Sequence, residues 1–261
     1  MGSWLGLPEV ASAHGAALDE INVLVHWLML VLFIGWAAFF LWLLVRFRRG
    51  RNPAADYRGI QTKAPKWMEG GVAAVEAVLL LAFSIPLWSE RVDAFPAEEE
   101  STVVRVVGQQ FAWNVHYPGP DGVFGATRVE LVNEETNPLG LDASDPAGAD
   151  DVTSINNLYL PVDRPAIVHL SSKDVIHGFM LNEMRVKQDA IPGQVIPIWF
   201  EVTRSGHYQL LCAELCGWGH YKMKARVVAE PLSHYQQYLE DLQKDQNDDG
   251  VADAPSQDED E

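Results

Sequence analysis

The sequence predicts an α+β membrane protein, in which an N-terminal two-helix transmembrane hairpin precedes an all-β sandwich or barrel domain. Two long apolar runs lie near the start of the chain, and the connection between them is rich in basic residues. The stretch from Thr102 to Glu230 contains short β-branched and aromatic segments separated by turn residues. These features divide the chain into a hairpin (1–95), an external domain (96–232) and an acidic tail (233–261).

The two apolar runs are long enough to cross a membrane. Val23–Val45 is 23 residues long and contains no charged residue, and Gly70–Trp88 is 19 residues long and contains one acid, Glu76. A helix of about 20 apolar residues spans the hydrocarbon core of a bilayer. We therefore expect membrane-spanning helices at about 21–46 and 69–91.

The basic residues predict how the hairpin is oriented. The segment between the runs carries 7 of the 19 Lys and Arg residues: Arg46, Arg48, Arg49, Arg51, Arg58, Lys63 and Lys66. The positive-inside bias places this segment in the cytoplasm, so everything after about Arg91 is expected outside. No basic residue precedes Arg46, so the opening residues lack the basic region of a signal peptide and are expected to lead into a retained helix.

The net charge of −17 is unevenly distributed. Glu240–Glu261 contains ten acids and one Lys, which contribute −9, and its low apolar content predicts disorder. The other excess acids belong to the external domain, where they could steer a basic partner or simply keep the surface soluble, including at high salt. Both interpretations stay open. The sequence shows no internal repeat and no basic run typical of nucleic-acid binding, so no nucleic-acid partner is expected.

The external domain is predicted to be built from short strands. A polar, Asp/Pro/Gly-rich stretch between Asn133 and Asn157 reads as an inserted loop. Several short strands that are separated by turn residues favour a sandwich or barrel, and about 130 residues suffice for one hydrophobic core. The expected strands are Thr102–Gly108, Phe111–Tyr117, Thr127–Val132, Ala166–Leu170, Val195–Val202 and Ala225–Ala229.

A twelve-residue segment holds both cysteines of the chain and a concentrated set of metal donors. Cys212, Cys216, His220 and Met223 follow one another within it, and His177 lies upstream at an expected strand edge. A disulfide between the cysteines is possible in an external compartment, but it leaves the His and Met without a role. Tetrahedral zinc would use two Cys and two His, but it would leave the thioether idle, and soft sulfur favours copper.

The number of donors exceeds what a single copper ion requires. Two thiolates, two imidazoles and one thioether fit two coppers bridged by both sulfurs, with one His on each copper and the thioether on one of them. A backbone carbonyl between the cysteines can fill the last weak position. Such a pair shares one electron between its metals and keeps its geometry on reduction, which suits electron transfer.

The motif Cys-x-Glu-x-Cys-Gly-x-Gly-His-x-x-Met closely resembles the dinuclear copper (CuA) loop of cytochrome c oxidase subunit II. The resemblance covers nearly the whole chain through five ordered features: the hairpin, an aromatic segment, Lys173–His177, Lys187–Gly193 and the loop itself. It implies a cupredoxin-like external domain in a multi-pass protein of the bacterial plasma (inner) membrane, with the copper domain on the periplasmic side.

The resemblance also implies the role of each donor. Cys212 and Cys216 would bridge two copper ions, and His177 and His220 would be their terminal ligands. Met223 and the backbone carbonyl of Glu214 would be the weak ligands. The side chain of Glu214 would additionally bind a magnesium ion shared with subunit I.

One segment departs from the family pattern. The family usually reads Gly-His-Gln-Trp-x-Trp, with the first Trp receiving electrons from cytochrome c. Here Gly108-Gln-Gln-Phe111-Ala-Trp113 places Phe in that position. Either Phe111 or Trp113 is then the residue at which electrons enter, and Trp113 could equally be a core aromatic. The Cys-x-x-Cys-His motif of haem-bearing members is absent, so no haem is expected in this chain.

Two glutamates of the second apolar run are candidates for the entrance of a proton channel. Glu76 lies inside the run, where a charge is costly and therefore often functional. Glu69 lies seven residues earlier, on the same helical face and nearer the cytoplasmic edge. The family places a glutamate at a channel mouth near the start of this helix, which Glu69 fits better. Both side chains could instead only contact helices of the catalytic subunit.

The expected function is that of an oxidase subunit. The chain would accept electrons from a cytochrome c that is soluble, membrane-bound or fused elsewhere. It would pass them to haem in subunit I, where oxygen is reduced to water with proton pumping. Other oxidase subunits and the lipid bilayer are the further expected partners. The alternative is a membrane-anchored copper-binding or delivery protein. A quinol oxidase subunit usually lacks the copper ligands, and nitrous oxide reductase requires a His-rich domain that is missing here.

Overall fold

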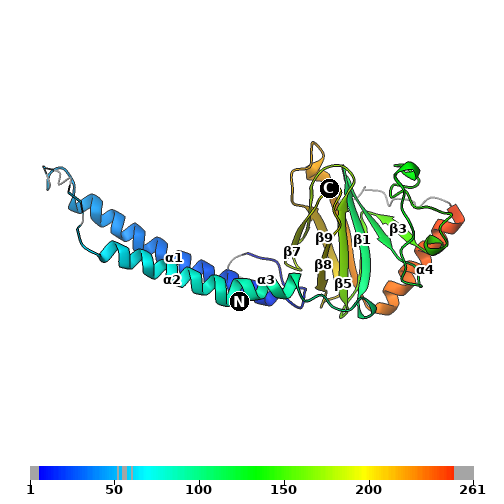
Figure 1. The fold of residues 1–261 in the computed structure, drawn as a ribbon, viewed down its shortest axis with the longest axis horizontal. Helices are drawn as coiled ribbons and strands as arrows, with labels where there is room; N and C mark the ends of the chain where they lie inside the picture. Colours follow the sequence, from blue (N-terminus) through cyan, green and yellow to red (C-terminus); the bar gives the residue numbers. More distant parts are fainter. Residues whose placement is uncertain (1–5, 52, 55–57, 60, 250–261) are drawn as a thin grey trace. The chain divides into compact units, whose positions relative to one another are not determined.

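A computed structural model describes residues 6–249 apart from 52, 55–57 and 60, and it separates into two compact units (Figure 1). The described part of the first unit is the helical hairpin, up to Asp93. The second unit combines Pro8–Ala16 with the chain from Ala94 onward. The expected hairpin domain of 1–95 is therefore wrong for residues 8–16.

The two apolar runs form helices that are longer than predicted. The first helix begins six residues before the expected position 21, and the second begins five before 69, where Pro65 occupies an early helical position that suits proline. Both contain long apolar windows whose side chains are not buried within the chain, as lipid-facing helices require. The bounds are α1 Gly15–Arg46, α2 Ala64–Leu79, a π-helical turn η2 Leu80–Ser84, and α3 Ile85–Val92.

Residues 8–14, which we call the strap, bind along the external domain. Ala11 N–H donates to the Glu183 carbonyl at 2.8 Å, and its own carbonyl accepts from Thr203 N–H at 2.9 Å. Ser12 pairs antiparallel with Val202, just beyond the end of an edge strand. These contacts make the strap part of the same compact unit as the external domain.

The external domain is a sandwich of two five-stranded sheets, as the sequence predicts. Strand order is β3-β2-β1-β5-β8 in one sheet and β4-β10-β9-β6-β7 in the other. Most neighbours are antiparallel, but β1 with β5 and β10 with β4 are parallel. The bounds are β1 Thr102–Gln109, β2 Ala112–Tyr117, β3 Val152–Ile155, β4 Asn157–Pro161, β5 Pro165–Ser172, β6 His177–Leu181, β7 Val186–Ala190, β8 Ile196–Glu201, β9 Gly206–Cys212 and β10 Lys224–Glu230.

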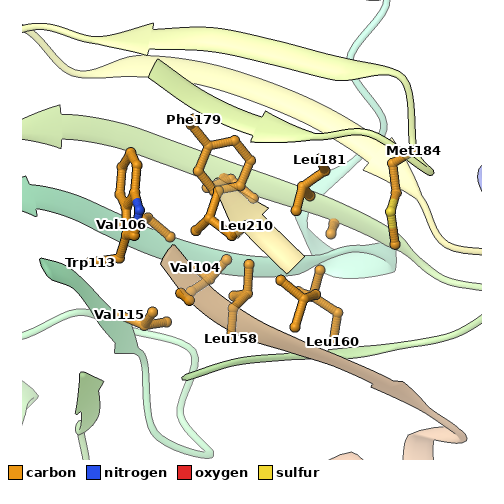
Figure 2. Packing of buried hydrophobic residues seen from close by; sticks show 14 of the residues in the cluster. Val104, Val106, Trp113, Val115, Leu158, Leu160, Phe179, Leu181, Met184 and Leu210 are labelled. Atoms are coloured by element: carbon orange, nitrogen blue, oxygen red, sulfur yellow. The ribbon is translucent and has the colours of Figure 1, made fainter. Parts of the chain in front are cut away.

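The inner faces of both sheets supply one hydrophobic core. Strand β1 alternates between buried and partly exposed residues along its whole length, so every second side chain points inward. The figure shows side chains from both sheets meeting in this layer (Figure 2). The labelled members are Val104, Val106, Trp113, Val115, Leu158, Leu160, Phe179, Leu181, Met184 and Leu210.

The region between β2 and β3 differs from the prediction. The expected strand Thr127–Val132 is instead a short 3₁₀ turn, η4 Val129–Leu131, with one isolated bridge from Thr127 to Leu141. The expected loop Asn133–Asn157 contains β3 and a further 3₁₀ turn, η5 Pro146–Gly148. A short β-branched run resembles a strand in sequence, but Val129 is 85% exposed and has no sheet partner.

A buried, hydrogen-bonded His–Asp pair anchors this inserted region to the sandwich. His116 Nε2 lies 2.6 Å from Asp151 Oδ2, and both side chains are almost completely buried. The same carboxylate accepts N–H bonds from Gly119 and Gly125, at the start of the insertion. Burial alone would raise the pKa of Asp151, but these hydrogen bonds lower it below its ordinary value.

Most of the predicted disordered tail is helical in the structure. Helix α4, Leu232–Asp249, packs against the domain, with Tyr235 buried and the ring of Tyr238 stacked 3.5 Å from that of Tyr159. Composition averaged over the tail hides its amphipathic stripe: Tyr235, Tyr238, Leu239 and Leu242, spaced at one helical face. The prediction of disorder is wrong for residues 233–249, and residues 250–261 lie outside the described part.

We expect Asp151→Asn to destabilise the external domain by about 1–3 kcal/mol at pH 7, because it weakens a buried hydrogen-bond hub. The folded-state pKa of Asp151 is lowered, so its stabilisation is present above the unfolded value of about 3.9 and is lost as the pH falls below that. Urea unfolding of the full chain in detergent, followed by near-UV circular dichroism, measures both effects.

The matched control is Asp121→Asn, because Asp121 is exposed and bonds only the nearby Val123 N–H through its side chain. The control should retain the wild-type stability within about 0.5 kcal/mol. Equal stability of the Asp151 variant and the control between pH 7 and pH 3 would show that the buried pair does not hold the insertion.

Candidate metal centre

The predicted metal donors come from three neighbouring strands of one sheet. Cys212 ends β9, and His177 begins β6, which pairs with β9. The loop from Ala213 to Met223 connects β9 to its other neighbour β10 and contains a 3₁₀ turn, η6 His220–Lys222. Donors that are 46 residues apart in sequence (His177 to Met223) therefore meet at one end of the sandwich.

A close backbone contact holds β6 against the start of this loop. Ala213 N–H donates to the Gly178 carbonyl at 2.8 Å. A Cβ added to Gly178 would lie only 2.8 Å from the carbonyl carbon of Ala213, so a larger residue would push the loop away. Glycine beside His177 is therefore required for the imidazole and the thiols to be this close.

The structure brings six predicted donor groups together. The two thiol sulfurs lie 3.7 Å apart. His177 Nδ1 is 4.0 Å from Cys212 Sγ, and His220 Nδ1 is 3.6 Å from Cys216 Sγ. The set is completed by the thioether of Met223, 3.8 Å from Cys216 Sγ, and by the carbonyl oxygen of Glu214, 3.2 Å from Cys212 Sγ.

These distances fit donors that share metal ions. Around zinc, thiolate and imidazole donors lie at about 2.3 and 2.0 Å, so two of them at a tetrahedral angle are about 3.5 Å apart. The thiols are free, and their 3.7 Å separation exceeds the roughly 2.05 Å of a disulfide bond. Met223 lies with the other donors, so the zinc alternative, which leaves it idle, does not account for its place.

The donors are largely removed from water. The exposed fraction is 0% for His177, 2% for Met223 and 4% for Cys216. Cys212 and His220 are partly buried. Uncharged thiols and imidazoles tolerate such a position, whereas thiolates require a compensating positive charge. A buried Cys/Cys/His/His/Met set is therefore suited to a soft cation.

Asp174 orients His177 and was not identified from the sequence. Its Oδ1 lies 2.8 Å from His177 Nε2, which leaves Nδ1 directed at the sulfurs. A carboxylate on the second ring nitrogen is the usual way to fix the tautomer of a ligating imidazole. Asp174 also accepts the backbone N–H of Gln110. The spacing Asp-x-x-His is the sequence signal that could have identified it.

The two thiols differ in acidity. Burial alone would raise the pKa of Cys212, but hydrogen bonds with the His177 ring and with the backbone of Glu214 and Gly178 lower it to about 6. Burial raises the pKa of Cys216 to about 11, and the neighbouring Cys212 acts in the same direction. Without a cation, one negative charge is thus shared unequally by the pair.

The side chain of Glu214 points to a different partner from its carbonyl. Its carboxylate lies 2.7 Å from Lys187 Nζ, and both side chains are well exposed. This hydrogen bond raises the pKa of Lys187. The carboxylate is accessible from solvent.

The two aromatic candidates occupy different environments. Trp113 is fully buried, and its ring lies 6.0 Å from that of His177 and 5.8 Å from that of Phe179, edge to face in both cases. Phe111 lies in the turn between β1 and β2 and is 36% exposed. Trp113 is therefore a core aromatic that touches the metal-site histidine, and only Phe111 reaches the surface.

The two glutamates of the second apolar run lie on α2. This helix belongs to the first unit, whereas the metal donors belong to the second. Glu69 and Glu76 are two helical turns apart, or about 10 Å along the axis. Both are exposed within the chain.

The fold and the donors define a membrane-anchored, cupredoxin-like metal-binding protein. The family model described as cytochrome c oxidase subunit II, periplasmic domain, matches residues 102–230. The alternative cytochrome c oxidase subunit 2 of Bradyrhizobium diazoefficiens is 36% identical over 238 residues, which cover 91% of this chain and 83% of that relative. The chain belongs to the cytochrome c oxidase subunit II family.

One further curated relative agrees with this assignment. Cytochrome c oxidase subunit 2 of Synechocystis is 29% identical over 251 residues, covering 89% of this chain and 74% of that protein. The crystal structure of the periplasmic domain of subunit II from Bradyrhizobium japonicum is 25% identical, with a TM-score of 0.42, and covers 57% of this chain and 97% of that one. The chain is thus a subunit of an oxidoreductase complex, anchored by two helices with a periplasmic domain.

We expect Cys212 to react with iodoacetamide at least 10-fold faster than Cys216 at pH 7 in the metal-free full chain. The thiolate is the nucleophile, and a pKa of about 6 makes Cys212 mostly thiolate at pH 7, whereas Cys216 stays protonated. Tandem mass spectrometry of the peptide that contains both cysteines locates the modification. The rate for Cys212 should fall as the pH drops through about 6.

Cys212→Ser is the matched control, in which Cys216 should remain slow because it is buried. Copper added before the reagent should protect both thiols of the wild type. Alkylation of both cysteines at the same rate, or faster reaction at Cys216, would contradict the asymmetry.

Proposed function

We propose that the chain accepts single electrons from cytochrome c at a dinuclear copper centre and passes them to haem in subunit I of its oxidase. There oxygen would be reduced to water with coupled proton pumping. The observation that carries the proposal is the convergence of two thiols, two imidazoles, a thioether and a carbonyl at the end of the sandwich. Family membership supplies the oxidase context.

The donor distances suggest which residues hold each copper. Cys212 and Cys216 would bridge, with His177 and the Glu214 carbonyl on the Cys212 side. His220 and Met223 lie on the Cys216 side. Two coppers bound in this way supply one-electron redox chemistry with the electron shared between the metals.

The residues of the chain keep the site rigid. Asp174 holds the ring of His177, and Gln110 Nε2 donates to the Cys216 carbonyl at 2.6 Å. Cys212 N–H donates to the Met223 carbonyl at 3.1 Å, which closes the base of the loop. Because these bonds are independent of the metal, the ligands need to move little when the electron arrives or leaves.

Glu214 is the residue that would connect the copper site to subunit I. Its carbonyl faces Cys212, while its exposed carboxylate lies on Lys187. We propose that this carboxylate binds a magnesium ion at the interface with subunit I. Hard cations prefer carboxylate oxygen, and the other ligands would come from the partner and from water.

The remaining parts of the chain serve the assembly. The hairpin would contact subunit I, other subunits and lipid through its exposed apolar side chains. The basic connection between α1 and α2 would lie in the cytoplasm of a bacterial cell. No haem is proposed here, and electrons would come from a separate cytochrome c. Glu69, nearer the cytoplasmic end of α2, is proposed as the proton-channel entrance, with Glu76 as the alternative.

The burial of the donors opposes the alternative function of copper delivery. A delivery protein must release its metal to another chain, which requires accessible ligands. Here the side chains of His177 and Met223 are buried at one end of the sandwich. A permanent redox centre accounts better for this arrangement.

Copper bound to the full chain is expected to give an electron paramagnetic resonance spectrum from one electron shared by two equivalent copper nuclei. The two thiols are close enough to bridge both metals, so the unpaired electron can spread over them. Metal analysis should give two copper ions per chain. A spectrum from a single copper nucleus, with one ion per chain, would disprove the dinuclear assignment.

Cys212→Ser should leave the other four side-chain donors able to hold one copper, so the spectrum should change to that of one nucleus. Oxidase turnover with cytochrome c should then be largely lost, since the bridge is broken. Ser144→Ala is a suitable control, because Ser144 lies in the inserted region and bonds only to Asp142. Wild-type turnover in the Cys212 variant would refute the bridging role.

A further inference from the structure

The outer surface of the metal-binding loop carries three exposed apolar side chains. Trp218 is 88% exposed, Leu215 84% and Tyr221 72%. One exposed apolar residue is ordinary in a folded protein. Three within seven residues, directly over a buried donor cluster, form a surface that is costly in water and is typical of a protein interface. Trp and Tyr in particular dominate the energetics of such contacts.

Trp218 lies midway between two of the donors in the sequence. One glycine separates it from Cys216 and one from His220, and these two residues are donors for the same proposed copper. The loop on either side is tightly hydrogen-bonded: His220 N–H donates to the Gly217 carbonyl, and Lys222 N–H to that of Gly219. The indole is therefore held by a rigid frame while its faces remain in solvent.

Phe111 supports the loop from the other side. A Cβ added to Gly219 would lie 2.5 Å from Phe111 Cδ2, and one added to Gly217 would lie 3.3 Å from Phe111 Cε1. The phenyl ring thus packs on the two glycines that flank Trp218. Most of its surface is covered, whereas the indole between those glycines is open. Trp113, with no exposed surface, is inaccessible to a partner.

Acidic side chains adjoin the Phe111 side of the loop. Asp174 accepts the N–H of Gln110, and Glu134, which also pairs with Lys173, lies 3.0 Å from Gln109 Nε2. The chain as a whole carries a net charge of −17. An apolar contact beside acidic groups complements a partner that has an apolar face within a basic rim, and opposite charges raise the rate of encounter.

We propose that Trp218 is the residue that the electron donor touches, and that the donor is a soluble cytochrome c with a basic rim around its exposed haem edge. This inference rests on the proposed function. The donor iron loses one electron and the copper centre gains it, with no bond made or broken and no proton transferred. Trp218 lies between the two redox centres as a contact and is not itself consumed, while Phe111 positions the loop beneath it.

The test uses the assembled oxidase and reduced mitochondrial-type cytochrome c as the probe. Flash photolysis measures the second-order rate constant for reduction of the copper centre, and Trp218→Ala should lower it at least 10-fold. Trp218→Phe, which keeps an aromatic face, should recover part of the loss. The control Val129→Ala removes an equally exposed apolar side chain from the inserted region and should leave the rate unchanged.

Two further measurements separate a contact role from a structural one. The copper spectrum of Trp218→Ala should match that of the wild type. Its reduction by a small ruthenium complex, which needs no docking surface, should also keep the wild-type rate. An altered spectrum or a slower reaction with the small reductant would overturn the proposal in favour of a structural role.

Other outcomes would overturn the inference in distinguishable ways. A rate constant within twofold of wild type excludes Trp218, and a 10-fold loss in Phe111→Ala alone would assign the contact to Phe111. The Trp218→Ala chain could also dissociate from the oxidase, while the complexes that stay assembled keep the wild-type rate constant. That result would mean that Trp218 faces a neighbouring subunit. If the wild-type oxidase itself holds no copper pair, or is not reduced by cytochrome c, the proposed function fails before Trp218 is tested.

Discussion

The pairing of β6 with β9 is the constraint on which the site depends. The hydrogen bond from Ala213 to Gly178 lies just beyond the last paired residues of these strands, and it brings His177 to a loop that starts 36 residues later in the chain. Because the contact needs glycine and involves only backbone atoms, it is independent of the metal. The core that positions both strands thereby also positions the donors, and a metal ion would bind to a site that the fold has already assembled.

Burial of these donors has an electrostatic consequence. Two adjacent thiols cannot both ionise without a cation, which is reflected in the low pKa of Cys212 and the high pKa of Cys216. Bound copper would remove this conflict by supplying positive charge where the protein supplies none. The nearby carboxylate of Asp174 acts through the histidine, and that of Glu214 is turned toward Lys187. The interior is thus left to sulfur and nitrogen donors.

The sequence predicted the features that are local or strongly patterned, and it missed those that depend on tertiary contacts. The spans, the sandwich and the donor set follow from apolar length, alternation and motif spacing. The strap has no pattern of its own, since residues 8–14 are ordered by hydrogen bonds with distant parts of the chain, among them the backbone of Glu183, Glu201 and Thr203. Helix α4 was missed because an acidic composition outweighed four apolar residues on one face. The side chain of Trp113 could not be placed, since a strand aromatic next to a turn can face either way.

The segment from Cys212 to Met223 carries two kinds of side chain, metal donors and exposed apolar residues, which alternate along the sequence. Side-chain donors recur at intervals of four, four and three residues, and the exposed apolar residues Leu215, Trp218 and Tyr221 fall between them at intervals of three. The donors are buried or partly buried, whereas the three apolar residues face solvent. The indole of Trp218 is exposed midway between Cys216 and His220, where a partner that touches it contacts the loop between two donors. The same spacing, considered for its apolar residues as well as its donors, would have indicated Trp218 from the sequence alone.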